Sequence, residues 1–466
     1  MSSEWRVMTL NQAGVVLIDC DHKTPKAVGS GQPYIGIPQL KNGRITLEGA
    51  RLISPEDFTH WRRKALPMPN DVILSRRCNP GETAYVPEGL NIALGQNLVL
   101  LRATNENVYP PFLRWLTQGP AWWTQVNSFI NVGAVFDSLK CVDIPKFLVN
   151  LPPYKEQIRI SEILCTLDDK IQINEQVNQT LEQMAQALFK SWFVDFEPVK
   201  VKMAVLEAGG SQEGATLAAM TAISGKDADA LAVFEREHPA QYAELKATAE
   251  LFPSAMQDSE LGDIPEGWSI KQLDEIATYQ NGLALQKFRP ENESDFLPVV
   301  KIAQLKKGFA DGEEKASPNI KPECIIDNGD VVFSWSGSLM VDIWCGGRAA
   351  LNQHLFKVSS SRYPKWLYYK YTTHHLIEFQ RIAEAKAVTM GHIKREHLSQ
   401  AKCLIPAAET VHAFTPFFEP VLNKIISNRL ETRKLENIRD TLLPKLLSGE
   451  ITLPEAEQAV SEAENV

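Results

Sequence analysis

The sequence has no apolar run of about 18 or more residues, the length that a membrane-spanning helix needs. Its N-terminus lacks the basic stretch followed by an apolar stretch that marks a secretory signal peptide. The seven cysteines are scattered and odd in number, and no two of them form a Cys-x-x-Cys pair. This pattern favours reduced thiols over disulfides or a zinc site. We therefore expect a cytoplasmic protein that binds no membrane and holds no metal.

The motifs that many enzymes need are also missing. There is no Gly-x-Gly-x-x-Gly loop and no Walker loop, so neither a dinucleotide site nor a triphosphate site is indicated. Residues 150–154 read Asn-Leu-Pro-Pro-Tyr, and Leu151 interrupts the Asn-Pro-Pro-Tyr of amino-methyltransferases. His374-His375 lacks metal-ligand spacing. We expect this chain to hold no catalytic residue and no cofactor.

A net charge of −9 argues against nucleic-acid binding until it is divided along the chain. Residues 1–150 hold 15 Lys and Arg against 12 Asp and Glu, and residues 266–403 hold 18 against 16. Residues 195–265 hold 5 against 13, and residues 451–466 add four glutamates and no base. The acid therefore lies in a spacer and a tail. The two domain-sized segments are mildly basic, which is weak support for nucleic-acid binding.

One long segment occurs twice, because residues 164–190 align with residues 418–444 without a gap. In both copies, apolar residues recur at alternating steps of four and three, which is the period of a coiled coil. An asparagine stands at the same level in each copy, and such a residue usually fixes the register of paired helices. The residues expected to pair the helices are Leu167, Ile171, Asn174, Leu181, Leu188, Val421, Ile425, Asn428, Leu435 and Leu442.

Matched registers favour two long helices that pair with each other, most simply antiparallel. The alternative is that each amphipathic helix packs only on its own domain. Pro416 and Pro420 indicate that the second helix becomes regular after its opening turn, and Pro444 should end or kink it.

The segments before the two helices also repeat, at much lower identity. Short apolar runs separated by Gly, Pro and Asn predict short strands, and helices are expected over 110–126 and 363–380. Asp71-Val-Ile-Leu-Ser matches Asp330-Val-Val-Phe-Ser, and Ala93-Leu-Gly-Gln-Asn matches Ala350-Leu-Asn-Gln-His. The two segments therefore share one topology.

We expect an α+β protein in which two mixed α/β domains are separated by two long helices, paired as an antiparallel coiled coil with pseudo-two-fold symmetry. The expected parts are a first domain at 1–150, a long helix at 151–198, an acidic, partly helical spacer at 199–264, a second domain at 265–405, a second long helix at 406–450 and an acidic tail at 451–466.

Candidate DNA contacts follow matching strands in the two domains. Arg76 and Arg77 come directly after one such strand, and Trp335, Ser336 and Ser338 follow its counterpart. Arginine suits guanine, and hydroxyls suit phosphates. For each basic residue, the alternative is an ordinary solvated charge. Gln96-Asn97 and Gln353-His354 could form paired hydrogen bonds to adenine, or they could equally satisfy backbone groups at the strand ends. The candidates are Arg62, Arg63, Lys64, Arg76, Arg77, Gln96, Lys306, Lys307, Trp335, Ser336, Ser338, Gln353, Lys394 and Arg395.

This organisation resembles the specificity (S) subunit of Type I restriction–modification systems. The resemblance extends to four phrases, ALFKSWFVDFEPV at 187–199, DSELGDIPEGW at 258–268, GDVVFSWSGS at 329–338 and LLPKLLSGEI at 442–451. It implies that each domain is a target recognition domain reading one half of a split DNA sequence. It also implies that the helices set the gap between the halves and dock two methyltransferase (M) subunits.

The same resemblance implies that restriction (R) subunits join to form the DNA-cleaving complex. S-adenosylmethionine, ATP and Mg are then expected on the partner subunits and not on this chain. Two other functions stay open from the residues alone. One is a single-chain DNA methyltransferase or nuclease with its own catalytic site, and the other is a coiled-coil adaptor with no role on DNA.

Overall fold

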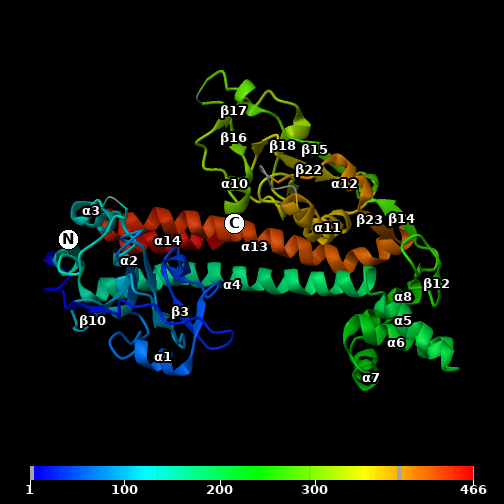
Figure 1. The fold of residues 1–466 in the computed structure, drawn as a ribbon, viewed down its shortest axis with the longest axis horizontal. Coiled ribbons are helices and arrows are strands. Elements are labelled where there is room, and N and C mark those ends of the chain that lie inside the picture. Colours follow the sequence, from blue (N-terminus) through cyan, green and yellow to red (C-terminus); the bar gives the residue numbers. More distant parts are fainter. Residues whose placement is uncertain (1–4, 134, 293, 386–390, 465–466) are drawn as a thin grey trace. The chain divides into compact units, whose positions relative to one another are not determined.

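The computed structural model describes residues 5–133, 135–292, 294–385 and 391–464. It divides into two compact units, one made of Met1–Gln172 with Thr432–Val466 and the other of Ile173–Glu431. Two long helices, α4 (Tyr154–Phe193) and α13 (Ala408–Ser448), contribute to both units (Figure 1). Each unit therefore combines one strand-rich domain with one stretch of each long helix. Among the described residues, no helix is both long and apolar enough to cross a membrane.

The first unit contains a four-stranded sheet in the order β2-β10-β7-β8 and a three-stranded sheet in the order β6-β3-β9. Its strands are β1 (Arg6–Thr9), β2 (Val15–Asp19), β3 (Gln32–Ile35), β4 (Leu40–Lys41), β5 (Arg44–Ile45), β6 (Arg51–Ile53), β7 (Val72–Ser75), β8 (Thr83–Tyr85), β9 (Ala93–Leu94), β10 (Leu98–Ala103) and β11 (Leu148–Leu151). Its other helices are α1 (Pro55–Trp61), α2 (Pro110–Leu116), α3 (Pro120–Phe129) and α14 (Leu453–Glu464).

The second unit repeats this topology, with a four-stranded sheet in the order β15-β22-β19-β20 and another in the order β17-β16-β21-β18. Its strands are β12 (Met256–Gln257), β13 (Ile264–Pro265), β14 (Ser269–Gln272), β15 (Thr278–Asn281), β16 (Leu297–Val300), β17 (Lys315–Ala316), β18 (Ile325–Ile326), β19 (Val331–Ser334), β20 (Met340–Ile343), β21 (Ala349–Leu351), β22 (Leu355–Ser359) and β23 (Lys402–Ile405). Its shorter helices outside the spacer are α9 (Leu273–Ile276), α10 (Ile302–Lys307), α11 (Lys365–Ala385) and α12 (Arg395–Gln400).

The main sheet of each unit is covered on both faces. All four residues of β7 are buried, and alternation sends Val72 and Leu74 into one apolar core while Ile73 enters another. In β19, Val331 and Phe333 likewise enter one core and Val332 enters another. The predicted α+β architecture and the shared topology of the two domains are therefore confirmed.

The long helices pack against each other in antiparallel fashion. In the first unit, Leu164 and Leu167 of α4 share an apolar core with Leu435 and Leu442 of α13. In the second unit, Asn178 lies against Asn428, and the rings of Trp192 and Phe414 lie 4.7 Å apart. The partner's residue number falls as the number in α4 rises, which confirms the antiparallel pairing.

The helix α13 is continuous through Pro416, Pro420 and Pro444. The expectations that it becomes regular only after Pro416 and Pro420, and that Pro444 ends it, are therefore wrong. A proline within a helix deprives the carbonyl four residues earlier of its donor. Here those carbonyls belong to His412, Pro416 and Asp440, whose side chains are exposed, so water can replace the missing donor.

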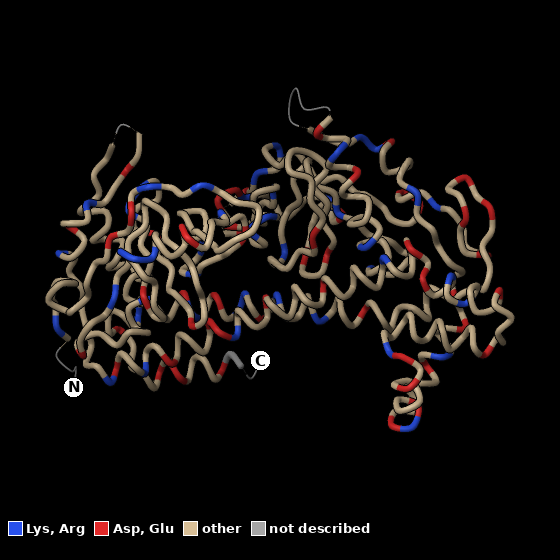
Figure 2. The backbone as a smooth tube through the Cα atoms, turned by 60° about the horizontal axis from the view of Figure 1, so that its bottom comes forward, with Lys and Arg blue, Asp and Glu red and all other residues tan. Residues whose placement is uncertain are grey.

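The spacer forms four helices, α5 (Glu197–Glu207), α6 (Gln212–Ser224), α7 (Ala228–Glu237) and α8 (Pro239–Leu251). They enclose a small apolar core around Met220, Leu231 and Leu245. The buried ammonium of Lys202 donates hydrogen bonds to the carbonyls of Ala249 (3.1 Å) and Phe252 (2.5 Å), at the end of α8. Burial lowers the pKa of Lys202, because it disfavours the charged form. Acidic residues occur along this insert and along α14 (Figure 2).

Candidate nucleic-acid interface

Three chain segments meet at one edge of the main sheet in each unit. In the first, β2 and β7 both pair antiparallel with β10, so their C-terminal ends lie beside the N-terminal end of β10. In the second, β15 and β19 stand in the same relation to β22. The candidates Arg76 and Gln96 lie at this edge in the first unit, and Trp335 and Gln353 lie at it in the second. We call these two regions the first and the second recognition edge.

The first recognition edge is basic. Arg76 Nη2 lies 3.2 Å from His22 Nδ1, which is also 3.1 Å from the carbonyl of Gln96. His22 Nε2 lies 3.0 Å from Asp19 Oδ2, so it donates to this carboxylate. Lys64 donates to the carbonyl of Cys20 at 3.0 Å. Two cations and an imidazole are thus held beside one another at the ends of the strands.

Asp19, Cys20 and His22 also bring their side-chain ligand atoms close enough together to suggest a metal site. The sulfur chemistry does not fit one. Cys20 Sγ lies 3.2 Å from the carbonyl oxygen of Gly95 and 3.1 Å from that of Leu98, so its one S–H donates to one of them at a time. Burial, with the nearby Asp19, raises the pKa of this thiol to about 11. A metal is bound by the thiolate, which these surroundings disfavour. The cluster is better described as part of the polar support of Arg76.

The second recognition edge has different chemistry. Trp335 Nε1 donates to the carbonyl of Gln353 at 3.2 Å, and Ser336 Oγ lies 3.0 Å from His354 Nδ1. Arg395 donates to Asn281 Oδ1 at 2.7 Å, and its guanidinium lies 5.4 Å from the centre of the Phe356 ring. This edge therefore combines a partly buried indole, the buried hydroxyl of Ser336, amides and one oriented guanidinium.

The remaining candidates have mostly local contacts. Lys306 donates to Ser338 Oγ at 2.8 Å, so these two candidates from different elements meet. Lys307 lies 3.6 Å from Asp311, and Lys394 lies 3.4 Å from Glu396. The guanidinium of Arg62 lies 4.7 Å from the Phe58 ring centre. Of the other candidates, Arg63, Lys64, Arg77 and Gln96 are exposed, and Gln353 is partly buried.

The sequence pattern did not single out His22 or Asn281, and it indicated His354 only beside Gln353. His22 lies three residues after the end of β2, Asn281 ends β15, and His354 directly precedes β22. Each of these residues lies beside the end of a strand whose neighbour in the sheet is followed by a candidate residue. This position can be recognised only from the strand order, which the sequence does not state.

A buried carboxylate ties the first domain to the helices. Asp168 of α4 is 2% exposed and forms an ion pair with Arg114 of α2. It also lies 2.7 Å from Arg44 of β5 and 3.1 Å from Arg439 of α13. Burial alone would raise the pKa of Asp168, but the charges and hydrogen bonds of Arg114 and Arg44 outweigh it and lower the pKa.

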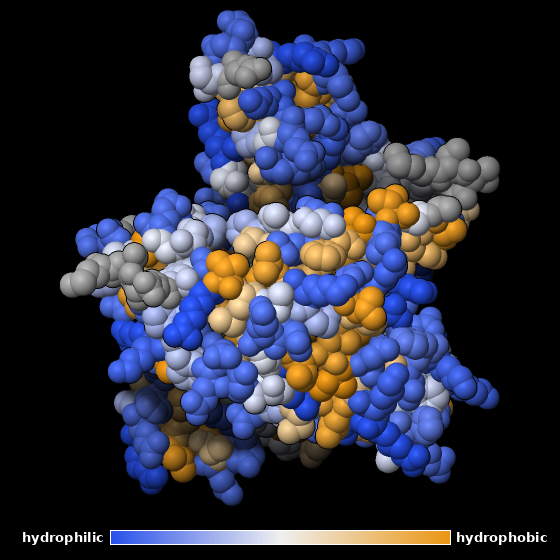
Figure 3. All heavy atoms as spheres, turned by 90° about the vertical axis from the view of Figure 1, so that its left-hand side faces the viewer, coloured by the Kyte–Doolittle hydropathy of each residue, from blue (hydrophilic) through white to orange (hydrophobic). Residues whose placement is uncertain are grey.

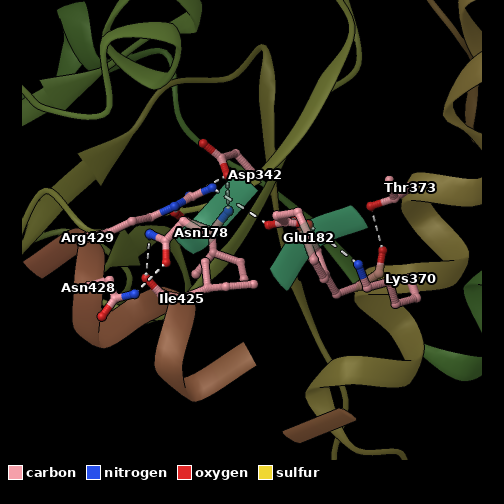
Figure 4. A network of polar contacts seen from close by, with 10 residues as sticks. Asn178, Glu182, Asp342, Lys370, Thr373, Ile425, Asn428 and Arg429 are labelled. Carbon is pink, nitrogen blue, oxygen red and sulfur yellow. Dashed lines mark hydrogen bonds and ion pairs between the residues drawn. The ribbon is translucent and has the colours of Figure 1, made fainter. Parts of the chain in front are cut away.

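A second polar cluster ties the other domain to the helices (Figure 4). Arg429 of α13 donates to Asp342 of β20 at 2.6 Å and lies 3.8 Å from Glu182 of α4. Glu182 accepts a hydrogen bond from the buried Lys370 of α11 at 3.5 Å. In Figure 4 these side chains converge from both long helices and from the domain. Each domain is thus held on the helices by charges that are buried, as at Asp168, or partly buried, as at Glu182 and Arg429.

Comparison with known proteins gives consistent results. The family model described as "Type I restriction modification DNA specificity domain" matches residues 3–183 and 265–438. The HindI specificity subunit, of a Type I restriction enzyme of Haemophilus influenzae, is 30% identical over 373 residues, covering 78% of each chain. The MjaIX specificity subunit of Methanocaldococcus jannaschii is 25% identical over 335 residues, covering 70% of this chain and 66% of the relative.

Among solved structures, the S subunit of a Type I restriction–modification system from M. genitalium has a TM-score of 0.53 at 11% identity. It covers 95% of this chain and 96% of its own, and it supports the fold. The two segments that match the family model are the two that carry the recognition edges, and they leave out the helical insert. With that match over most of its length, the chain belongs to the Type I restriction–modification DNA specificity family.

Proposed function

We propose that this chain is the non-catalytic DNA-reading subunit of a cytoplasmic Type I restriction–modification complex, and that each domain reads one half of a two-part DNA sequence. The observation that carries the proposal is the pair of recognition edges. They stand at the same place in one topology, yet one is basic and the other combines aromatic, hydroxyl and amide groups. Two domains that read different half-sites need recognition edges at equivalent positions with different side chains on them.

The chemistry of each edge suits double-stranded DNA. Arg76 can donate two hydrogen bonds to guanine in the major groove, and His22 and Asp19 hold it in place. Arg395 is oriented in the same way by Asn281 and by the Phe356 ring. The exposed Lys306 with Ser338 suits a phosphate, which positions the protein without reading sequence.

The paired helices act as the spacer between the two readers. The clusters around Asp168 and Glu182 hold each domain at one angle on its stretch of helix, so the helices would set the gap between half-sites. Two methyltransferase subunits would dock along them. On α4, the exposed Ile173, Val177 and Met184 fall on one helical face and offer apolar surface for this. S-adenosylmethionine, ATP and Mg²⁺ would then be bound by the methyltransferase and restriction partners.

Competition binding tests the assignment of one reader to each domain. The complex of this chain with its methyltransferase partner is measured with Arg76→Glu/Arg77→Glu, and with Arg395→Glu in the second unit. Duplexes altered in one half-site at a time serve as competitors. We expect the first variant to lose discrimination at one half-site only, and the second variant at the other. Equal losses at both half-sites for either variant would refute the assignment.

A further inference from the structure

A loop of the first unit exposes an apolar tip. It follows α3 and is closed by two backbone hydrogen bonds between Asn131 and Ser138, at 2.8 and 3.0 Å. Val132, Val135 and Phe136 are 84%, 77% and 59% exposed. Single exposed apolar residues are ordinary, but three within five positions mark a binding surface. Figure 3 shows that exposed apolar side chains do gather into patches on one face of the molecule.

The base of this loop is fixed to the first recognition edge. Leu139 donates its N–H to the carbonyl of Arg76 at 2.8 Å, and Ser138 forms a β-bridge with Arg77. The exposed Lys140 follows directly. The apolar tip is therefore bordered by three cations. Its partner must carry negative charge around an apolar group, which is the pattern of a DNA groove.

The shape of the tip is also set by the backbone. A Cβ atom on Gly133 would lie 2.3 Å from the carbonyl oxygen of Phe136, so only glycine allows the chain to turn this closely. Gly133 and Phe136 therefore approach each other closely at this tip.

We propose that this apolar tip enters the major groove of the DNA half-site read by the first unit and contacts thymine methyl groups. The proposal rests on the proposed function and adds a sequence preference to it. Base edges in the major groove present hydrogen-bonding atoms and, on thymine alone among the standard bases, a methyl group. The apolar tip, which is held beside Arg76, can pack against this methyl group. The half-site of the first unit then contains at least one thymine next to the pair that Arg76 reads.

Removing the methyl group tests this directly. The half-sites are first defined by methylation mapping, and the thymines of the first are then replaced one at a time by uracil, which keeps every hydrogen-bonding atom. We expect one such replacement to weaken binding of the complex about fourfold, the effect of one buried methyl group. Phe136→Ser and Val135→Ser should weaken binding to the thymine duplex and show no further loss with uracil. Val142→Ser is the matched control, because Val142 is 69% exposed in the same unit but lies outside the loop.

Other outcomes overturn the proposal. If duplexes with uracil bind the unaltered complex as tightly as duplexes with thymine, the methyl contact is excluded. Enhanced 2-aminopurine fluorescence at a base step, lost in Phe136→Ser, would mean that Phe136 is a wedge between bases. Loop variants that bind DNA normally but fail to assemble with the methyltransferase would assign the tip to a protein partner. If the complex does not distinguish a true half-site from a scrambled one, the proposed function itself fails, whatever the loop does.

Discussion

Asp168 and Arg114 form an ion pair whose side chains are only 2% and 6% exposed. One residue belongs to the long helix α4 and the other to α2 of the first domain. Removing one partner of a buried pair leaves a buried charge without compensation, which costs far more than losing a surface salt bridge. This pair is therefore a main point at which the first domain is held on the helix.

We expect Asp168→Asn to destabilise the first unit by about 3–5 kcal/mol, because Arg114 and Arg44 would lose their counter-ion. The measurement is denaturant unfolding of the complex or of the isolated chain. Asp169→Asn is the matched control, since Asp169 is the exposed neighbour on the same helix. Equal stability of the two variants would show that the cluster contributes little.

The same cluster predicts an acid dependence. The folded state lowers the pKa of Asp168, so its stabilising contribution is present above the unfolded pKa of about 3.9 and is lost as the pH falls through the folded value. Unfolding curves taken between pH 5 and pH 2, measured against Asp168→Asn, report this contribution. The difference in the free energy of unfolding between the unaltered protein and Asp168→Asn should become smaller as the pH falls. A constant difference would contradict the assigned charge state.

The asparagines at the helix interface predict a trade between stability and specificity. Asn428 Nδ2 donates to Asn178 Oδ1 at 2.9 Å, while Asn428 Oδ1 is buried without a partner among the described residues. Replacing both with leucine removes an unsatisfied polar atom, so thermal stability should rise. The register should become less defined, because polar interface residues fix it. Light scattering should then detect self-association of the variant. A variant that is less stable than the unaltered protein and stays monomeric would exclude a register-fixing role for the asparagines.

The two asparagines that the repeat aligns do not pair with each other. Asn174 meets Glu431, and Asn428 meets Asn178, because antiparallel pairing brings unlike levels of the two copies together. The helices themselves were predictable, since their apolar period is regular and strong. The strands Val72–Ser75 and Val331–Ser334 were also predictable as buried apolar runs between turn residues.

The polar clusters were not predictable. Asp168 stands next to Leu167 in a helix with many charged residues, and nothing local separates it from a solvated acid. Its partners Arg44 and Arg439 are distant in the chain and become neighbours only through the tertiary fold. The same holds for His22, whose role depends on the strand order. Long-range packing, and not local propensity, decides these positions.

His375 predicts that the stability of the second unit depends on pH in mildly acidic solution. Burial, together with His374, lowers the pKa of His375 to about 4, although its hydrogen bond to the Lys402 carbonyl at 3.0 Å acts in the opposite direction. Between about pH 6.5 and this value the unfolded chain binds more protons, so stability should fall as the pH decreases. His375→Gln keeps a donor without titrating and should flatten this part of the profile. His238→Gln, at an exposed position, should leave it unchanged.

Lengthening the helices tests their role as a spacer. One heptad is inserted into α4 after Gln172 and one into α13 after Arg433, at matching levels of the antiparallel pair. Seven residues add about 10 Å of helix, which is about three base pairs of DNA at 3.4 Å each. Methylation mapping should detect unchanged half-sites separated by a longer gap. A gap of the original length would refute the spacer role.

The proposed function requires one chain to carry two readers for the two halves of one DNA site. The decisive experiment is methylome sequencing of cells that carry this chain with its methyltransferase partner. We predict adenine methylation at a single motif made of two unlike half-sites with a fixed gap. In cells carrying Arg76→Glu/Arg77→Glu, only one of those halves should lose its definition. Methylation at an undivided motif, or simultaneous loss of both halves in the variant, would contradict the account.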